Sequence, residues 1–284
     1  NTVVAGVSFS INEGEVLGLV GESGCGKSVT AMSLISLLPS PPSNREKGSI
    51  KLLGREIAGL PESELQAIRG AEVGFIFQEP MSSLNPVLTI GYQLSEAILL
   101  HQKLTKKEAH EKAVEMLNLV GVSDPELRTG QYPHELSGGM RQRVMIAMAL
   151  MCSPKLLIAD EPTTALDVTI QAQILDLLNT LRSKLGMSIL MITHDLGVVA
   201  ETCSQVVVMY AGRIVERGPV NEIFTAPKHP YTKALIASSP RGAARQSQLP
   251  TIPGIVAAPS ERKVGCSFAP RCILVTEKCR TSKP

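Results

Sequence analysis

The strongest chemical signal in the sequence lies at residues 21–28. They read Gly-Glu-Ser-Gly-Cys-Gly-Lys-Ser and fit the pattern G-x-x-x-x-G-K-[ST]. Glycines let a backbone approach a phosphate group closely, so that its N–H groups form an anion site. Lys27 can place a positive charge on the β- and γ-phosphates, and the Ser28 hydroxyl can ligate Mg²⁺. The pattern predicts a nucleoside triphosphate site.

The segments on either side of this loop support the same prediction. Residues 15–20 are typical of a short buried strand, and residues 29–38 have the length and apolar content of a helix. The alternative is a glycine turn that precedes Lys-Ser by chance, as the bare pattern would in about one such chain in a hundred. The flanking elements favour the nucleotide site. Its predicted contacts are Gly21, Glu22, Ser23, Gly24, Cys25, Gly26, Lys27, Ser28 and Val29.

Polar residues end three apolar, strand-like runs further along the chain. They are Gln78, the pair Asp160 and Glu161, and His194. Ligands bind at the carboxyl ends of strands in open α/β sheets, so we expect these residues to face the nucleotide. Asp160 is predicted to hold Mg²⁺ together with Ser28 and Gln78. Glu161 is predicted to accept a proton from an attacking water.

His194 is predicted to contact the γ-phosphate or to orient that water. With Glu161 and Gln78, it completes the predicted catalytic set. The alternative for Asp160 and Glu161 is a polar strand end that faces solvent, and the alternative for His194 is a structural role. The upstream glycine loop favours the ligand-facing interpretation.

A second glycine-rich segment, Ser137-Gly138-Gly139, precedes a helical pattern. Helix N-termini bind anions, so the segment could be a second phosphate site. A capped helix start explains the same residues equally well. On the residues alone, both interpretations stay open.

Composition and charge limit the classes of protein that fit. The chain has 284 residues, 44% of them hydrophobic, and a net charge of +2, which argues against a nucleic-acid partner. No apolar run approaches the roughly 18 residues of a membrane helix, and Asn1 begins no cleavable leader. We expect an intracellular chain that meets a membrane only through a partner.

The predicted elements divide the chain into three parts. Residues 1–83 and 153–218 alternate strands and helices as an α/β core, with a hairpin formed by residues 206–210 and 213–216. Helical patterns at 91–100, 106–119 and 139–152 predict a helical subdomain inserted at 84–152. From residue 219 prolines interrupt every long element, and 240–263 is predicted as a linker-like tail within a C-terminal extension, 219–284.

Together these motifs resemble the ATP-binding-cassette (ABC) ATPases over essentially the whole chain. The resemblance implies a P-loop NTPase (RecA-like) α/β fold with an inserted helical subdomain. The matching segments are residues 21–28 (Walker A), Gln78 (Q-loop), 136–140 (signature), 156–161 (Walker B), 164–167 (D-loop) and His194 (switch histidine).

A closer resemblance is to the ATP-binding subunits of dipeptide and oligopeptide importers. It rests on residues 78–86 (Gln-Glu-Pro-Met-Ser-Ser-Leu-Asn-Pro), on Met140, and on residues 229–235 (His-Pro-Tyr-Thr-Lys-Ala-Leu). Nickel importers share these features, so nickel or another solute is an alternative cargo. A soluble cassette without a permease and a redox-sensing regulatory module are further alternatives.

The resemblance also implies how the chain assembles. Two cassettes face each other head to tail, so that Ser137, Gly138 and Gly139 of one chain contact the nucleotide of the other. The implied partners are a paralogous ATPase chain, two membrane permease subunits and a solute-binding protein, with no nucleic acid. The implied location is peripheral, at the cytoplasmic face of the inner membrane.

The chain departs from the family at two places. The aromatic residue that stacks on adenine would fall at or before Asn1. Cys266, Cys272 and Cys279 resemble an iron–sulfur motif, for which we expect a [4Fe–4S] cluster, but no fourth cysteine follows them before Pro284. The spacing matches neither zinc nor ferredoxin patterns, so the alternative is a loose tail with incidental thiols.

Overall fold

The computed structural model describes residues 1–40, 43, 47–79, 83–164, 166–239, 250–262 and 264–282. These residues divide into two units. The first comprises Asn1–Ile11, Glu15–Ser33 and Met191–Pro284, and the second comprises Asn12–Gly14 and Leu34–Leu190. The chain passes from the second unit to the first within one strand, β6 (Ser188–Thr193).

The first unit is built on β1 (Val16–Val20), β7 (Gln205–Tyr210) and β8 (Arg213–Pro219). All five residues of β1 are buried, and the strand pairs in parallel with β7. β7 continues through a tight turn into the antiparallel β8, which confirms the predicted hairpin. The other elements are α1 (Lys27–Leu34), α9 (Leu196–Thr202), α10 (Val220–Thr225), α11 (Pro230–Ala237), η2 (Ala269–Arg271) and α12 (Glu277–Thr281).

The helix predicted after the glycine loop is shorter than expected. It begins at Lys27 and ends at Leu34, so the prediction that it reaches residue 38 is wrong. Ser36 adopts a φ of 52°, a left-handed conformation that a right-handed helix excludes. The start of the helix, which matters for phosphate binding, lies where the motif requires it.

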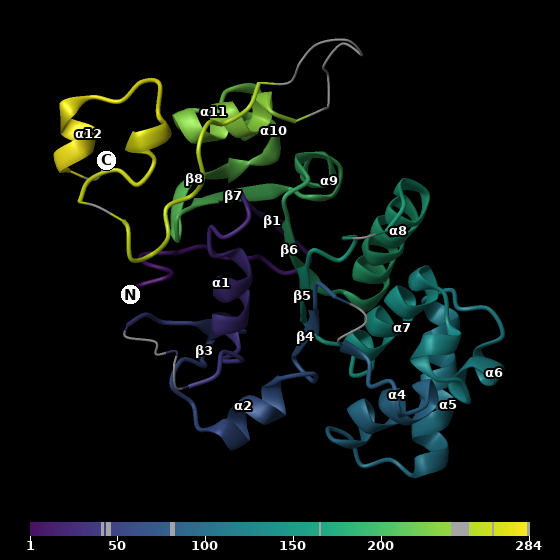
Figure 1. Ribbon diagram of the computed structural model, residues 1–284. Coiled ribbons are helices and arrows are strands. Elements are labelled where there is room, and N and C mark those ends of the chain that lie inside the picture. The colour runs from purple at the N-terminus through teal and green to yellow at the C-terminus, as the bar shows by residue number, and fades with distance from the viewer. Residues whose placement is uncertain are drawn as a thin grey trace. The chain divides into compact units, whose positions relative to one another are not determined.

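One hydrophobic cluster joins the β7–β8 hairpin to the C-terminal extension. Figure 1 shows α10 and α11 beside β8. Tyr210, Tyr231 and Phe268 lie in this cluster, and Ile252 and Val256 pack against it. Residues 240–249 and 263 of the predicted linker lie outside the described residues. Residues 250–262 form no helix or strand, but they pack on the cluster, so the described part of the tail is not loose.

The second unit holds the helical region. Its strands β4 (Val73–Ile76) and β5 (Leu156–Asp160) pair in parallel, and its helices α4 to α7 lie together in Figure 1. The other elements and bounds are β2 (Lys51–Leu52), β3 (Arg55–Glu56), α2 (Glu62–Ile68), α4 (Ile90–Leu99), α5 (Lys106–Leu119), α6 (Pro125–Thr129), η1 (Pro133–Glu135), α7 (Gly138–Leu150) and α8 (Val168–Leu185).

The three helices predicted between 84 and 152 are confirmed as α4, α5 and α7. Local signals explain where helices begin and end. Thr105 and Glu108 form a capping box at the start of α5, and Gly186 ends α8 at a φ of 62°. Parallel strands alternating with helices confirm the α/β class. The domain boundaries themselves stay a prediction.

Candidate functional site

The glycine loop of the first unit has a backbone that only glycine adopts easily. Gly21, Gly24 and Gly26 have φ values of 153°, 75° and 105°. A Cβ atom at Gly21 would lie 2.3 Å from the carbonyl oxygen of Met209, so no larger residue fits there. The loop leads directly into α1, whose first N–H groups point out of the helix N-terminus. This arrangement is that of a phosphate cradle.

Lys27 is buried within the loop itself. Its Nζ donates to the carbonyl oxygens of Gly21, at 2.8 Å, and Glu22, at 3.3 Å. The Lys27 ammonium group therefore lies against the backbone of the loop. A bound phosphate oxygen can replace one of these carbonyl oxygens as its hydrogen-bond acceptor. Ser28, next along α1, is half-buried. Cys25 is fully buried, so any contact it makes to a nucleotide comes from its backbone.

The glycine loop contacts three residues from the hairpin turn and the C-terminal extension, and the sequence did not indicate these contacts. The backbone N–H of Gly212, in the hairpin turn, donates to the carbonyl oxygen of Cys25 at 2.7 Å. The Tyr231 hydroxyl accepts from the N–H of Glu22, and Arg271 forms an ion pair with the Glu22 carboxylate. The Glu22 side chain, predicted as a nucleotide contact, is thus paired with the C-terminal extension. Tyr231 belongs to the His-Pro-Tyr segment, but no sequence signal pointed to Arg271.

In the second unit, Gln78 and Glu161 lie together. The Gln78 side-chain amide donates to the Glu161 carboxylate at 3.0 Å, and the Thr164 hydroxyl donates to it at 2.9 Å. Glu161 has a φ of 49°, a strained conformation for a residue with a side chain. Such strain is found at functional sites, where the surroundings hold a side chain in one orientation.

The remaining predicted residues are placed as follows. Asp160, the last residue of β5, is buried, while His194 is exposed directly after β6 in the first unit. The donor set of Ser28, Gln78 and Asp160 consists of oxygen ligands, which suit Mg²⁺. Ala165 of the D-loop and Pro80, Met81 and Ser82 of the importer-like segment lie outside the described residues.

The signature segment lies at the surface of the second unit. Ser137 is the N-cap of α7 and accepts from the N–H of Met140 at 3.3 Å; Ser137 and Gly138 are both exposed. Gly139 is half-buried against the side chain of Ile170 in α8. The capped helix start, one of the two interpretations of this segment, is therefore present. An exposed helix N-terminus also leaves room for an anion carried by another chain.

Within the described residues, the three C-terminal cysteines are not gathered into a metal-binding group. The described residues contain no group of three or more His, Cys, Asp or Glu side chains that could hold a metal ion. Cys266 and Cys272 pack against the hydrophobic cluster, and the Cys279 thiol lies 3.2 Å from the Thr276 hydroxyl. The expected [4Fe–4S] cluster therefore has no support in the structure. The backbone N–H of Cys266 donates to the carbonyl oxygen of Cys279 at 2.8 Å.

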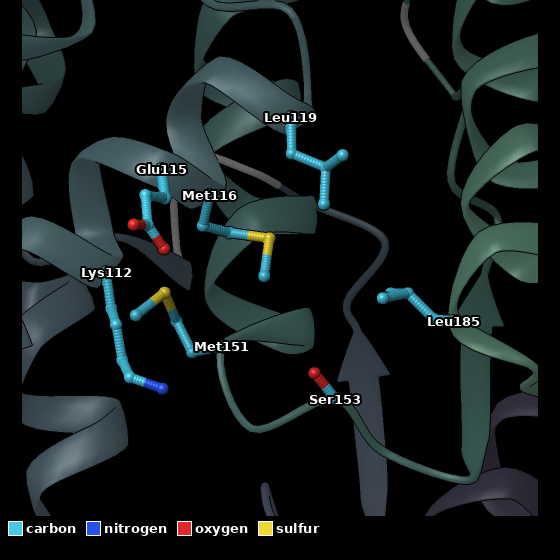
Figure 2. Close-up of a pocket in the computed structure, with 7 residues that line it drawn as sticks. All are labelled: Lys112, Glu115, Met116, Leu119, Met151, Ser153 and Leu185. Atoms are coloured by element: carbon cyan, nitrogen blue, oxygen red, sulfur yellow. The ribbon is translucent and has the colours of Figure 1, made fainter.

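A surface pocket of about 330 Å³ lies in the second unit (Figure 2). None of its lining residues belongs to the predicted nucleotide set, and polar and apolar groups contribute about equally to its wall. The lining residues are Lys112, Glu115, Met116, Leu119, Met151, Ser153 and Leu185. Among the described residues, no helix combines the length and apolar character needed to cross a membrane.

Comparison with known proteins places the chain in a family. Residues 4–164 match the ABC transporter family, and residues 215–279 match the oligopeptide/dipeptide transporter C-terminal region. The chain belongs to the ABC transporter family. As a member of this family, the chain is an ATPase that uses ATP with Mg²⁺. The geometry of the glycine loop agrees with this activity. Membership also identifies the fold as that of a P-loop NTPase.

Similar proteins cover almost all of this chain. The oligopeptide transport ATP-binding protein AppD of Bacillus subtilis is 53% identical over 99% of this chain and 86% of its own length. The dipeptide transport ATP-binding protein DppD of Escherichia coli is 49% identical over 98% and 85%. A solved structure of a dimeric ATP-binding cassette in a post-hydrolysis state, bound to ADP and Pi, matches with a TM-score of 0.68. It is 27% identical and covers 77% of this chain and 90% of that chain.

Proposed function

We propose that this chain is the ATP-hydrolysing subunit that powers import of di- and oligopeptides through a membrane permease. One observation carries the proposal. The same chain that matches the ABC transporter family over residues 4–164 also matches the oligopeptide/dipeptide transporter C-terminal region over residues 215–279. Relatives at 49–53% identity are named for oligopeptide and dipeptide transport. Nickel importers and soluble cassettes have no comparable support.

Each site residue has a role in this proposal. The loop N–H groups and Lys27 hold the β- and γ-phosphates and stabilise the charge that develops during transfer. Asp160, Ser28 and Gln78 would hold Mg²⁺, which would supply positive charge against the phosphates. Glu161 accepts a proton from the attacking water.

The orientation of Glu161 is fixed by Gln78 and Thr164, which both donate to its carboxylate. His194 completes the contacts to the γ-phosphate. Every one of these assignments can be tested by a single substitution.

Two cassettes share each ATP. Ser137, Gly138 and Gly139 of one chain contact the γ-phosphate held by the other chain's glycine loop, and the exposure of Ser137 and Gly138 suits this role. We infer that the second cassette is a paralogous chain. Two permease subunits and a solute-binding protein complete the importer, and the ATPase lies peripherally at the cytoplasmic face of the inner membrane.

The test uses the chain co-purified with its partners and reconstituted in vesicles. Wild-type complex is expected to take up a labelled tripeptide and not Ni²⁺, in an ATP-dependent manner. Glu161→Gln should lower ATP hydrolysis about 100-fold or more, because it removes the general base. Glu111→Gln, which changes an exposed glutamate on α5, is the control and should leave hydrolysis unchanged. Wild-type turnover in Glu161→Gln would remove that residue from its role.

An iron–sulfur cluster is not part of this proposal. The arrangement of Cys266, Cys272 and Cys279 provides no site for one within the described residues.

A further inference from the structure

The C-terminal extension contacts the glycine loop at Glu22. The two guanidinium nitrogens of Arg271 donate to the two oxygens of the Glu22 carboxylate, at 2.7 and 2.9 Å. This bidentate geometry is the strongest form of an arginine–carboxylate pair. The Arg271 side chain is only 5% exposed and the Glu22 side chain 28%, so water screens the pair weakly.

Arg271 is itself held in place by the extension. Its Nε donates to the carbonyl oxygen of Pro253 at 2.7 Å, and its Nη2 lies 3.2 Å from the carbonyl oxygens of Ile252 and Gly254. The hydrogen bonds to Glu22 raise the pKa of the Arg271 guanidinium above its ordinary value. The side chain therefore connects residues 252–254 to the glycine loop as a permanent cation.

A second contact reaches the same loop residue from α11. The Tyr231 hydroxyl accepts a hydrogen bond from the backbone N–H of Glu22 at 2.9 Å. The Tyr231 ring is fully buried and packs against Tyr210 and Phe268, with ring centroids 4.7 and 5.4 Å away. Burial raises the pKa of this hydroxyl, so it stays neutral and remains available as an acceptor.

We propose that Arg271 and Tyr231 are positioning residues that hold the glycine loop in the shape that binds ATP. A loop with glycines at 21, 24 and 26 is flexible when unrestrained, and ordering it opposes binding. Glu22 lies between the first two of these glycines, in the part of the loop with the least conformational preference of its own. The contacts to its carboxylate and to its backbone N–H therefore restrain this part of the loop. Pre-ordering a site in its bound shape increases affinity.

This inference depends on the proposed function only in taking ATP as the ligand. It assigns a role to the C-terminal extension that is independent of the transported solute. The extension completes the nucleotide site, and it does so from residues more than 200 positions away in the sequence.

The test measures binding of a fluorescent ATP analogue, and the KM and kcat of hydrolysis, with the full chain and Mg²⁺. Arg271→Ala should raise Kd and KM about tenfold, as removal of one member of a coupled pair does. Tyr231→Phe should raise both by a smaller factor and speed amide hydrogen exchange at Glu22. In both variants kcat should change less than KM, because chemistry uses other residues. Arg280→Ala removes an exposed arginine of the same segment and should change nothing.

A double variant separates positioning from general damage. Glu22→Ala combined with Arg271→Ala should bind ATP no more weakly than the weaker single variant, because the two residues act through one contact. Additive losses would overturn the inference, as would unchanged affinity in Arg271→Ala or an equal loss in Arg280→Ala. If Arg271→Ala fails to fold, Arg271→Lys and Tyr231→Phe apply the same criteria. Wild-type chain that binds no ATP would instead contradict the proposed function.

Discussion

Two thiols of this chain differ sharply in their surroundings. Cys25, in the glycine loop, is fully buried, and burial raises its pKa although the nearby Lys27 charge opposes the shift. At Cys279 the Thr276 hydroxyl hydrogen-bonds the sulfur and lowers the pKa of the thiol. Because the thiolate is the reactive form, Cys279 should react faster than Cys25, although Cys25 lies in the glycine loop.

We therefore expect iodoacetamide at neutral pH to modify Cys279 before Cys25 and before Cys203, whose pKa burial raises to about 11. Thr276→Val should slow the modification of Cys279, because it removes the hydrogen bond that stabilises the thiolate. Peptide mapping by mass spectrometry over a time course measures each rate. Faster labelling of Cys25 than of Cys279 would contradict the assignment.

At the scale of elements, α11 begins with an unusual cap. His229 is the N-cap, and its Nδ1 accepts from the backbone N–H of Tyr231 at 3.0 Å. Burial lowers the His229 pKa, and the Glu216 charge only partly opposes this. The cap requires an unprotonated Nδ1, so the folded state binds a proton at His229 less readily than the unfolded chain does.

The sign of the pH dependence follows from linkage. The unfolded state takes up more protons than the folded state as pH falls through the ordinary histidine value of about 6.5, so stability should fall with it. His229→Asn should flatten the decline in unfolding free energy between pH 7 and 5.5, since asparagine caps helices without titrating there. Urea unfolding followed by circular dichroism at several pH values measures the free energy of unfolding of each protein. Equal slopes for variant and wild type would exclude His229 as the cause.

A further loss of stability is expected at lower pH from Glu216. Its pKa is lowered although burial opposes this, because the backbone N–H groups of Lys228 and His229 hydrogen-bond its carboxylate. The unfolded chain should therefore protonate Glu216 first, and stability should fall as the pH drops below the ordinary carboxyl value of 4.5. This second decline should persist in His229→Asn, because the substitution keeps the backbone N–H donor at that position.

Elements with a local cause were predictable from the sequence. The strand before the glycine loop and the helices α4, α5 and α7 follow from apolar patterns and from caps a few residues away. The end of α1 was not predictable, because nothing in its composition indicates the left-handed Ser36. The contacts of Glu22 could not be found either, since Tyr231 and Arg271 lie 209 and 249 residues along the chain.

The prediction of an iron–sulfur cluster is not supported, because tertiary packing decides where the three cysteine side chains lie. Cys266, Cys272 and Cys279 lie within a short segment, and that proximity in sequence suggested a cluster. In the folded chain, Cys266 and Cys272 pack on the hydrophobic cluster, and Cys279 pairs with Thr276. Proximity along a chain does not by itself direct side chains to a common point.

At the scale of the whole molecule, a pair of cassettes implies that each chain contacts two nucleotides, its own ATP and the ATP of its partner. Lys27 would act on the ATP of its own chain, whereas Ser137 would act on the ATP of its partner. Ser137 also caps α7, so its substitution has a structural cost of about 1 kcal/mol that must be matched in any comparison. Thr89 provides the match, because it caps α4 in the same unit and belongs to no predicted site.

We expect Ser137→Ala to leave the ATP affinity of the isolated chain unchanged and Lys27→Ala to weaken it. In the assembled importer Ser137→Ala should lower hydrolysis about 100-fold, the usual loss for one donor to a transition-state oxygen. Thr89→Ala removes a comparable cap and should keep normal hydrolysis in the same complex. Fluorescence titration of the isolated chain and phosphate release from the importer provide the two measurements. Weaker ATP binding by isolated Ser137→Ala would place this serine at its own chain's nucleotide, and a head-to-tail pair would then have no basis.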